Sequence, residues 1–226
     1  MLVFGNEKFA NKFLDEKIFV CDENLPSPVK THPDMNLCII DDTVFLPPNS
    51  NLIDLFVNSK FSVVTIKTPL GNTYPYDVPL NCAVGKNTVI LNEKTVAPEI
   101  LSFCKLKGKE VICVNQGYAS CSCVVIDDNT FITADNGIYG ELIKHKKTAL
   151  LISAGYIQID EYDYGFIGGA SGFIDGVLHF FGDITAHPDY HKIDLFLKQN
   201  GVKYEFYKNE PLTDIGSVYD IQLPDR

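Results

Sequence analysis

The segment Gly168-Gly169-Ala170-Ser171-Gly172-Phe173-Ile174 leads from two glycines into a short strand of small and apolar residues. Four other segments have the same character, and the starting points of successive copies lie 41 to 48 residues apart. The five small-residue strands are expected at Asn36–Ile40, Asn81–Val84, Ser122–Ile126, Ala170–Ile174 and Gly216–Tyr219. A period of this length is typical of repeat architectures, in which no single unit buries its apolar face alone. The sequence therefore predicts five structural units.

Each unit is predicted to contain a leading strand, a connector, the small-residue strand, a tight turn, a second strand and a short helix. The leading strands are expected at Lys17–Cys21, Phe61–Ile66, Glu110–Val114, Ala149–Ser153 and Val202–Tyr207. The first four are continuous apolar runs, which favours parallel strands covered on both faces, whereas the fifth alternates and should expose one face. Turns rich in Asp, Asn and Gly precede the second strands, which are expected at Val44–Leu46, Val89–Leu91, Phe131–Thr133 and Leu178–Phe181.

The fifth unit has no second strand after Tyr219 unless Met1–Phe4 supplies it. We therefore expect Met1–Phe4 to pair with the C-terminal strand, and a helix from Asn6 to Lys17 to complete the same unit. A period that closes through the two ends of the chain predicts a ring. The expected fold is α/β, with five ββαβ units in a closed pseudo-fivefold β/α-propeller that forms a single domain over residues 1–226.

The composition argues against several classes of function. The chain has 226 residues, 46% of them hydrophobic, and a formal net charge of −10, so no nucleic-acid partner is expected. No apolar run reaches the roughly 20 residues of a membrane span, and the first residues lack the pattern of a signal peptide, so we expect no membrane partner and a cytoplasmic location. Neither the seven cysteines nor the pair His187 and His191 have the further ligands of a metal site, and no cofactor is expected.

Short motifs accompany the repeat, namely His32-Pro33-Asp34-Met35, Gly117–Cys121, Gly168–Gly172 and Leu212–Ser217. With these motifs and five ββαβ units, the chain resembles the pentein superfamily, also called the guanidino-modifying-enzyme fold, and in particular an uncharacterised bacterial family assigned to that fold. The superfamily includes arginine and agmatine deiminases, dimethylarginine hydrolases, amidinotransferases and a ribosome anti-association factor that is not an enzyme.

The resemblance implies a site with a cysteine nucleophile, a histidine for proton transfer and carboxylates that bind a guanidinium cation. By its match to the family's His-x-Asp segment, His32 is the candidate acid/base and Asp34 a candidate cation-binding carboxylate. The order of units in the family points to Cys82 as the nucleophile. Two departures separate this chain from the pattern. Apolar residues replace both acids of a glycine-rich family motif, and Ser217 stands where many family enzymes have cysteine.

An ungapped comparison of the five units adds further candidates. Asp34 and Asp214 occupy the same position, two residues before the small-residue strands of units that are neighbours in the ring. Cys121 falls one place further along in the third unit. We expect these three residues and His32 to cluster at one mouth of the central channel and to bind a small cationic ligand.

Each candidate also has a structural interpretation. The two aspartates are equally suited to capping turns or to joining neighbouring units by hydrogen bonds. Cys82 and Cys121 are candidate catalytic nucleophiles, and they are also typical of small buried thiols. Asn81 and Ser217, both in the small-residue strands, are the remaining candidate substrate-binding residues.

Two functions are compatible with these features. The first is a non-catalytic or degenerate pentein that binds a small molecule or a protein partner. The aromatic connectors Tyr74–Tyr76 and Tyr156–Tyr164 would then be a contact surface or a plug over the channel. The alternative is a thiol-dependent amidino-group hydrolase or transferase that acts on a small guanidine or amidine. The sequence leaves the substrate and the oligomeric state open.

Overall fold

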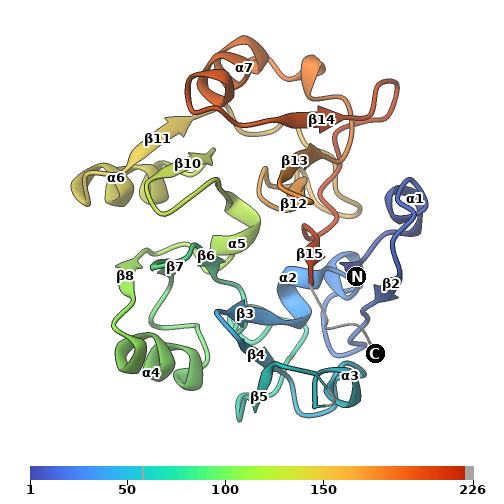
Figure 1. The fold of residues 1–226 in the computed structure, drawn as a ribbon, viewed down its shortest axis with the longest axis vertical. Coiled ribbons are helices and arrows are strands. Elements are labelled where there is room, and N and C mark those ends of the chain that lie inside the picture. The colour runs from blue at the N-terminus through green and yellow to red at the C-terminus, as the bar shows by residue number, and fades with distance from the viewer. Residues whose placement is uncertain (58, 222–226) are drawn as a thin grey trace.

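The strands of the protein form five small sheets that follow one another around a common centre (Figure 1). The computed structural model describes residues 1–57 and 59–221, and within these residues each sheet has three strands. The last five residues of the domain predicted over 1–226 lie outside the described residues. None of the described helices is long and apolar enough to cross a membrane.

Every sheet has the same order, in which an inner strand pairs antiparallel with a middle strand and the middle strand pairs parallel with an outer strand. Four of the sheets are β3(Cys38–Ile40)-β4(Thr43–Leu46)-β5(Ser62–Thr65), β6(Ala83–Val84)-β7(Thr88–Leu91)-β8(Glu110–Cys113), β9(Cys123–Val125)-β10(Thr130–Thr133)-β11(Thr148–Leu151) and β12(Ser171–Ile174)-β13(Val177–Phe180)-β14(Tyr204–Phe206). The inner strands lie in the predicted small-residue strands, and the middle and outer strands lie at the predicted second and leading strands. The predicted five-unit α/β repeat is confirmed at this level.

The fifth sheet joins the two ends of the described chain. Its middle strand is β1 (Leu2–Phe4), which lies between the inner strand β15 (Tyr219–Asp220) and the outer strand β2 (Lys17–Phe19). In this sheet Val3 is opposite Tyr219 in the antiparallel ladder. The predicted pairing of the N-terminal strand with the C-terminal strand is therefore confirmed.

The burial of the strands differs from the prediction. All residues of the middle strands β1, β4, β7 and β10 are buried, whereas the outer strands β2, β5, β8 and β11 contain exposed or half-buried residues at most positions. The expectation that the leading strands are covered on both faces is wrong, because they form the outer edge of each sheet. In β14 the exposed Glu205 lies between half-buried Tyr204 and Phe206, as the alternation predicts.

Helices cover the outside of the sheets or shape the turns near the centre. The outer helices are α1 (Glu7–Ala10), α3 (Ile53–Val57), α4 (Pro98–Lys107), α6 (Asn136–Lys144) and α7 (Tyr190–Gln199). The predicted helix from Asn6 to Lys17 is wrong in length, because α1 ends at Ala10 and the chain must then run out to β2. The Asn6 side chain caps α1 by accepting from the Lys8 and Phe9 amides, while Leu14 is fully exposed.

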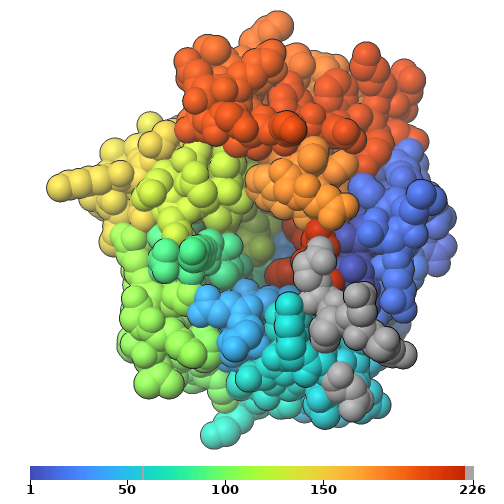
Figure 2. Space-filling view, in the orientation of Figure 1, coloured from blue at the N-terminus to red at the C-terminus, as the bar shows by residue number. Residues whose placement is uncertain are grey.

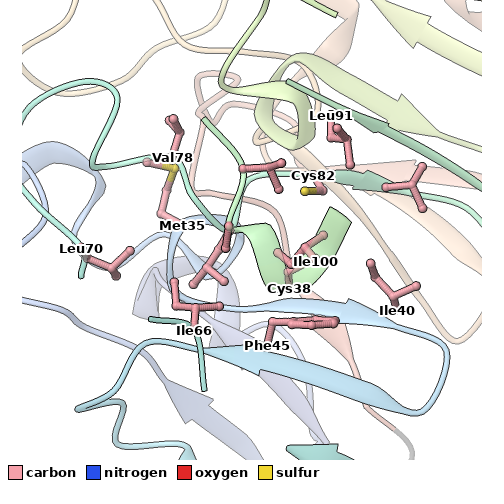
Figure 3. Packing of buried hydrophobic residues seen from close by; sticks show 14 of the residues in the cluster. Met35, Cys38, Ile40, Phe45, Ile66, Leu70, Val78, Cys82, Leu91 and Ile100 are labelled. Atoms are coloured by element: carbon pink, nitrogen blue, oxygen red, sulfur yellow. The ribbon is translucent and has the colours of Figure 1, made fainter. Parts of the chain in front are cut away.

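The apolar core is divided among the contacts between neighbouring units. Figure 3 shows one such cluster, in which Met35 and Phe45 of the first unit pack near Cys82 and Leu91 of the second and Ile100 of α4. Two short helices lie closer to the centre, α2 (Pro33–Asn36) and α5 (Ala119–Ser122), each directly before or beside an inner strand. The candidate site is built from these turns.

Candidate functional site

The residues that precede the inner strands come together from several units. The Asp34 amide in α2 donates to the Gly216 carbonyl oxygen at 3.1 Å, which joins the first unit to the fifth. The Gly169 amide donates to the Cys121 carbonyl oxygen at 3.0 Å, which joins the fourth unit to the third. These backbone bonds fix the ends of the inner strands relative to one another, so side chains far apart in sequence share one site.

Two glycines leave the room that the site needs. A Cβ atom on Gly169 would meet the Asp214 carboxylate, and one on Gly216 would meet the His32 side chain. Gly216 also has a φ of 72°, a conformation that glycine adopts at little cost. The neighbouring Gly168 also permits a close backbone approach, because a Cβ on this residue would meet the Ser120 carbonyl oxygen.

A cavity of about 180 Å³ contains three of the predicted site residues, His32, Cys121 and Asp214. All three are buried at its inner end. Its other lining residues are mostly apolar or aromatic: Val29, Tyr118, Ile159, Tyr162, Asp163, Tyr164 and Phe166. The structure therefore brings the predicted histidine, one predicted cysteine and one predicted carboxylate together.

His32 and Asp214 form the charged edge of this cavity. The distance between His32 Nδ1 and Asp214 Oδ1 is 3.7 Å, and His32 Nδ1 has no hydrogen-bond partner among the described residues. Burial lowers the pKa of His32 while the Asp214 charge opposes this effect. Burial raises the pKa of Asp214, and His32 and two backbone amides oppose the rise. Asp214 Oδ2 accepts from the Phe166 amide at 2.8 Å and Oδ1 accepts from the Gly216 amide at 3.0 Å.

Asp34 lies behind Cys121 and is fully buried. No hydrogen bond of normal geometry reaches either carboxylate oxygen from residues 1–57 or 59–221. The pKa of Asp34 is raised to about 7. Burial is the largest cause of this rise, and the negative charge of Asp214 adds to it, while the nearby Cys121 thiol and Asn81 amide oppose it. The interpretation of the two aspartates as turn caps fits Asp214, which accepts two backbone amides, and does not fit the Asp34 side chain.

Asn81 connects the first, second and third units beneath the cavity. Its Nδ2 lies 3.1 Å from the Asp34 carbonyl oxygen and 3.1 Å from Cys121 Sγ, and its Oδ1 accepts from the Ser120 amide at 2.7 Å. Asn81 therefore holds the Cys121 thiol in position. Burial raises the pKa of Cys121 well above its ordinary value, and the charges of Asp34 and Asp214 add to this effect.

The two remaining predicted residues, Cys82 and Ser217, lie in a different cavity. This cavity has a volume of about 340 Å³ and is lined by the inner strands, at the centre of the face seen in Figure 2. Ser217 Oγ donates to the Ser171 carbonyl oxygen at 2.7 Å. The neighbouring Cys38 thiol and burial raise the pKa of Cys82 well above its ordinary value. The structure does not bring either residue to His32.

Sequence reasoning missed three residues around the first cavity, Asp77, Tyr118 and Phe166. The Tyr118 and Phe166 rings stack with centroids 6.1 Å apart, and the Tyr118 hydroxyl donates to Asp77 Oδ2 at 2.5 Å. Their position in the repeat could have identified these three residues. Each lies four positions before the start of a small-residue segment, which is also the position of His32 in the first unit. No group of three or more His, Cys, Asp or Glu among the described residues is placed to hold a metal ion.

Comparison with solved structures shows which proteins share this fold. DDAH from Pseudomonas aeruginosa in complex with citrulline has a TM-score of 0.54 at 8% identity, with 83% of this chain and 71% of that chain covered. Agmatine deiminase from C. jejuni with substrate bound has a TM-score of 0.54 at 12% identity, with 95% of this chain and 79% of that chain covered. Both are pentein superfamily members, and the resemblance to this superfamily is confirmed for the fold.

A family model then identifies the particular group. The chain belongs to the family of unknown function DUF6873, whose model matches residues 8–219. A comparison with curated proteins gave no match. The description of the family gives no function.

Proposed function

We propose that the protein binds a small organic cation in the cavity lined by His32, Cys121 and Asp214, without transforming it. The observation that carries this proposal is the Asp34 carboxylate, which is buried close to Asp214 and accepts no hydrogen bond of normal geometry from a described residue. A buried carboxylate costs free energy unless a proton or a cation compensates its charge. An organic cation at the inner end of the cavity would supply that charge.

The walls and the size of the cavity also support a small cation. Tyr118 and Phe166 present aromatic rings, and Tyr162 and Tyr164 line the cavity nearer the surface. An aromatic face attracts a cation by about 0.5–2 kcal/mol. The volume of about 180 Å³ is below the roughly 300–1,000 Å³ of sites for drug-sized ligands. These features favour a compact cation such as an alkylguanidinium, an amidinium or an alkylammonium ion.

The state of Cys121 supports binding over catalysis. The thiolate is the nucleophilic form of cysteine, and burial together with two nearby carboxylates raises the pKa of this thiol well above its ordinary value. The thiol is therefore protonated at neutral pH when the cavity is empty. The replacement of family carboxylates and of the family cysteine by Ile167, Ala170 and Ser217 points the same way.

Thiol-dependent amidino chemistry is the second candidate function, because Cys121 and His32 line the same cavity. A bound cation would offset the negative charges that raise the pKa of Cys121. His32 would then accept the thiol proton, the thiolate would attack the amidino carbon, and His32 would pass the proton to the departing amine. Water or an acceptor amine would cleave the carbon–sulfur bond of the resulting intermediate and restore the Cys121 thiol. This reaction would act on the same small guanidines or amidines as the binding function.

We also propose that the five sheets form a closed pseudo-fivefold propeller that acts as one domain around the site. The pairing of β1 with β15 supports this closure. Four of the five units line the cavity, and Asn81 of the remaining unit contacts Cys121. In a closed ring, the position of each inner strand depends on its two neighbours. The geometry of the cavity then depends on the integrity of the whole ring.

A thermal-shift experiment tests the proposed binding. Methylguanidinium chloride is compared with sodium chloride at equal ionic strength, with the wild type, Asp34→Asn and Asp214→Asn. A ligand at 100 times its Kd stabilises the native state by about 2.7 kcal/mol, which raises the Tm of a protein of this size by about 5–10 °C. We expect this rise in the wild type and in the control Asp15→Asn, whose residue is exposed and does not line the cavity. We expect its loss in the other two variants.

The same samples separate the two candidate functions. Release of ammonia or an alkylamine from methylguanidine, abolished in Cys121→Ala, would support the thiol-dependent reaction. Stabilisation without release, retained in Cys121→Ala, would support binding alone. The absence of any Tm rise with methylguanidinium, butylguanidinium and butylammonium in the wild type would contradict the proposed function.

A further inference from the structure

Four aromatic rings are in contact along one wall of the cavity. The centroid of the Tyr118 ring lies 6.2 Å from that of Tyr74 and 6.1 Å from that of Phe166. The Phe166 ring in turn contacts Tyr164 at 6.3 Å. Tyr118, Phe166 and Tyr164 line the cavity, and Tyr74 extends the aromatic wall beyond it. Because Tyr118 contacts a ring on each side, its orientation determines how this wall faces a ligand.

The Tyr118 ring is held by Asp77, a residue that does not line the cavity. The Tyr118 hydroxyl donates to Asp77 Oδ2 at 2.5 Å, a length typical of a hydrogen bond from a hydroxyl to a carboxylate. At the backbone of the same tyrosine, the Tyr118 amide donates to Gln116 Oε1 at 3.1 Å. A Cβ on Gly117 would meet the Tyr74 ring, so this glycine leaves room for the neighbouring ring. These contacts fix Tyr118 at both of its ends.

The charge of Asp77 is not balanced by another side chain. Asp77 is buried, and its Oδ1 has no hydrogen-bond partner among the described residues. Within residues 1–57 and 59–221, no Lys, Arg or His side chain forms an ion pair with it. Burial raises the pKa of Tyr118, and the hydrogen bond to Asp77 and the Asp77 charge add to this rise. The phenol therefore keeps its proton at neutral pH and remains the donor.

A carboxylate that accepts from a phenol changes the face of the phenol ring. Hydrogen-bonded groups polarise one another, so the Tyr118 hydroxyl becomes a stronger donor and its ring becomes richer in electrons. The face of an aromatic ring is already negative and attracts cations. The carboxylate also attracts a cation directly, across a part of the protein where the dielectric constant is low. Both effects act on a cation, whereas packing against the ring does not distinguish a cation from a neutral molecule.

From this arrangement we infer that Asp77 is a positioning residue that makes the cavity select a cation over a neutral ligand of the same shape. Asp77 acts through the Tyr118 ring, which it orients and makes more negative, and it does not touch the ligand. The inference rests on the proposed function and adds a determinant of charge specificity outside the cavity. The second unit, which supplies no lining residue among those described, takes part in recognition in this way.

Calorimetric titration at pH 8 with two probes of matched shape tests the inference. The probes are butylguanidinium, which is a cation, and butylurea, which is neutral. The measured quantity is the ratio of their affinities, which a merely structural role of Asp77 would leave unchanged because both probes would lose affinity together. We expect the wild type to favour butylguanidinium by at least about tenfold. In Asp77→Asn, which keeps an acceptor for the Tyr118 hydroxyl, this ratio should fall about fivefold.

Tyr118→Phe is the second variant, because it keeps the ring and removes the link to Asp77. The ratio should fall in this variant as well, and adding Asp77→Asn to it should lower the ratio by less than twofold, since residues that act together are not additive. Glu99→Gln is the matched control. Glu99 in α4 also has a buried carboxylate oxygen without a hydrogen-bond partner among the described residues, and it does not line the cavity. This variant should keep the wild-type ratio.

The outcomes separate the inference from the proposed function. A wild type that binds butylguanidinium no more tightly than butylurea would refute the proposed cation site, and the inference with it. A wild type that prefers butylguanidinium, with the same ratio in Asp77→Asn or in Tyr118→Phe, would overturn the inference and leave the cation site intact. The two variants are independent tests, so a folding defect in one of them leaves the other to decide.

Discussion

Val3 in β1 is the ladder partner of Tyr219 in β15, although 216 positions separate them in the sequence. Val3 is fully buried in the middle strand of its sheet. We predict that Val3→Asp lowers the free energy of unfolding by about 3–5 kcal/mol, because it buries an unpaired charge where the two ends of the chain meet. Urea denaturation measures this change. Leu14→Asp, at a fully exposed position of the same segment, should alter stability by less than about 0.5 kcal/mol.

Because the pKa of Asp34 is raised, replacing this residue with asparagine should stabilise the protein relative to the wild type, and by more at higher pH. The ordinary pKa of this carboxyl is 3.8, and in the folded protein it is raised to about 7. The folded state therefore retains a proton that the unfolded state releases, so stability falls as pH rises from about 4 to 7. Relative to the wild type, Asp34→Asn should become more stable between pH 4 and pH 8 by up to about 4 kcal/mol. A difference that does not change with pH would contradict this prediction.

Cation binding should strengthen over the same range of pH. The ionised fraction of Asp34 rises from about one-tenth at pH 6 to about nine-tenths at pH 8, given its pKa of about 7. We predict that the affinity for methylguanidinium, which stays protonated throughout, increases about ninefold between these pH values. Calorimetric titration measures the affinity, which in Asp34→Asn should stay at or below the wild-type value at pH 6 throughout this range. An affinity that falls with pH would exclude the carboxylates as the cation's partners.

Gly169 provides a test of the space around Asp214. A Cβ on Gly169 would meet the Asp214 carboxylate, so Gly169→Ala should cost about 1–3 kcal/mol of stability and weaken cation binding. Gly140→Ala is the control. This glycine lies in α6 with no atom within 4 Å of an added Cβ, and alanine should stabilise the helix by about 0.5–1 kcal/mol. Thermal denaturation measures the stability of both variants. Equal changes in stability for Gly169→Ala and Gly140→Ala would contradict the close contact between Gly169 and the Asp214 carboxylate.

The cysteines should differ in reactivity according to burial. Cys21 and Cys113 are exposed, whereas Cys82 and Cys121 are buried. The pKa values of all four thiols are raised, and those of the buried pair are raised well above the ordinary value. In the ligand-free protein at pH 7, iodoacetamide should label the exposed pair first, as followed by peptide mass spectrometry. Labelling of Cys121 faster than either exposed thiol would show an activated nucleophile. That result would favour the thiol-dependent reaction over binding alone.

The repeat made the topology predictable from the sequence. The period located the inner strands, and the missing second strand of the last unit predicted the role of Met1–Phe4. The end of α1 at Ala10 was not predictable from the apolar residues that follow it, because the position of β2 determines where the helix must stop. Exposed Leu14 belongs to that part of the chain.

The site was only partly predictable, because single positions along an inner strand decide which cavity a side chain enters. Cys121 lies one residue before the start of its small-residue segment and lines the cavity with His32. Cys82 lies one residue after the corresponding start and lines the other cavity. The order of units in the resembling family cannot resolve such a shift. The contribution of Tyr162 and Asp163 depends on how a long connector folds back, which local sequence does not determine.

The five segments before the inner strands carry different side chains at corresponding positions of the repeat. One turn supplies His32 and another Tyr118, while the turn of the fourth unit supplies Phe166 together with the glycine pair that leaves space for the Asp214 carboxylate. Exchanging a side chain at one of these turns would alter the recognition chemistry and leave the strand pairing untouched. A lineage built on this scaffold can therefore gain or lose an activity by single substitutions, long before its architecture changes.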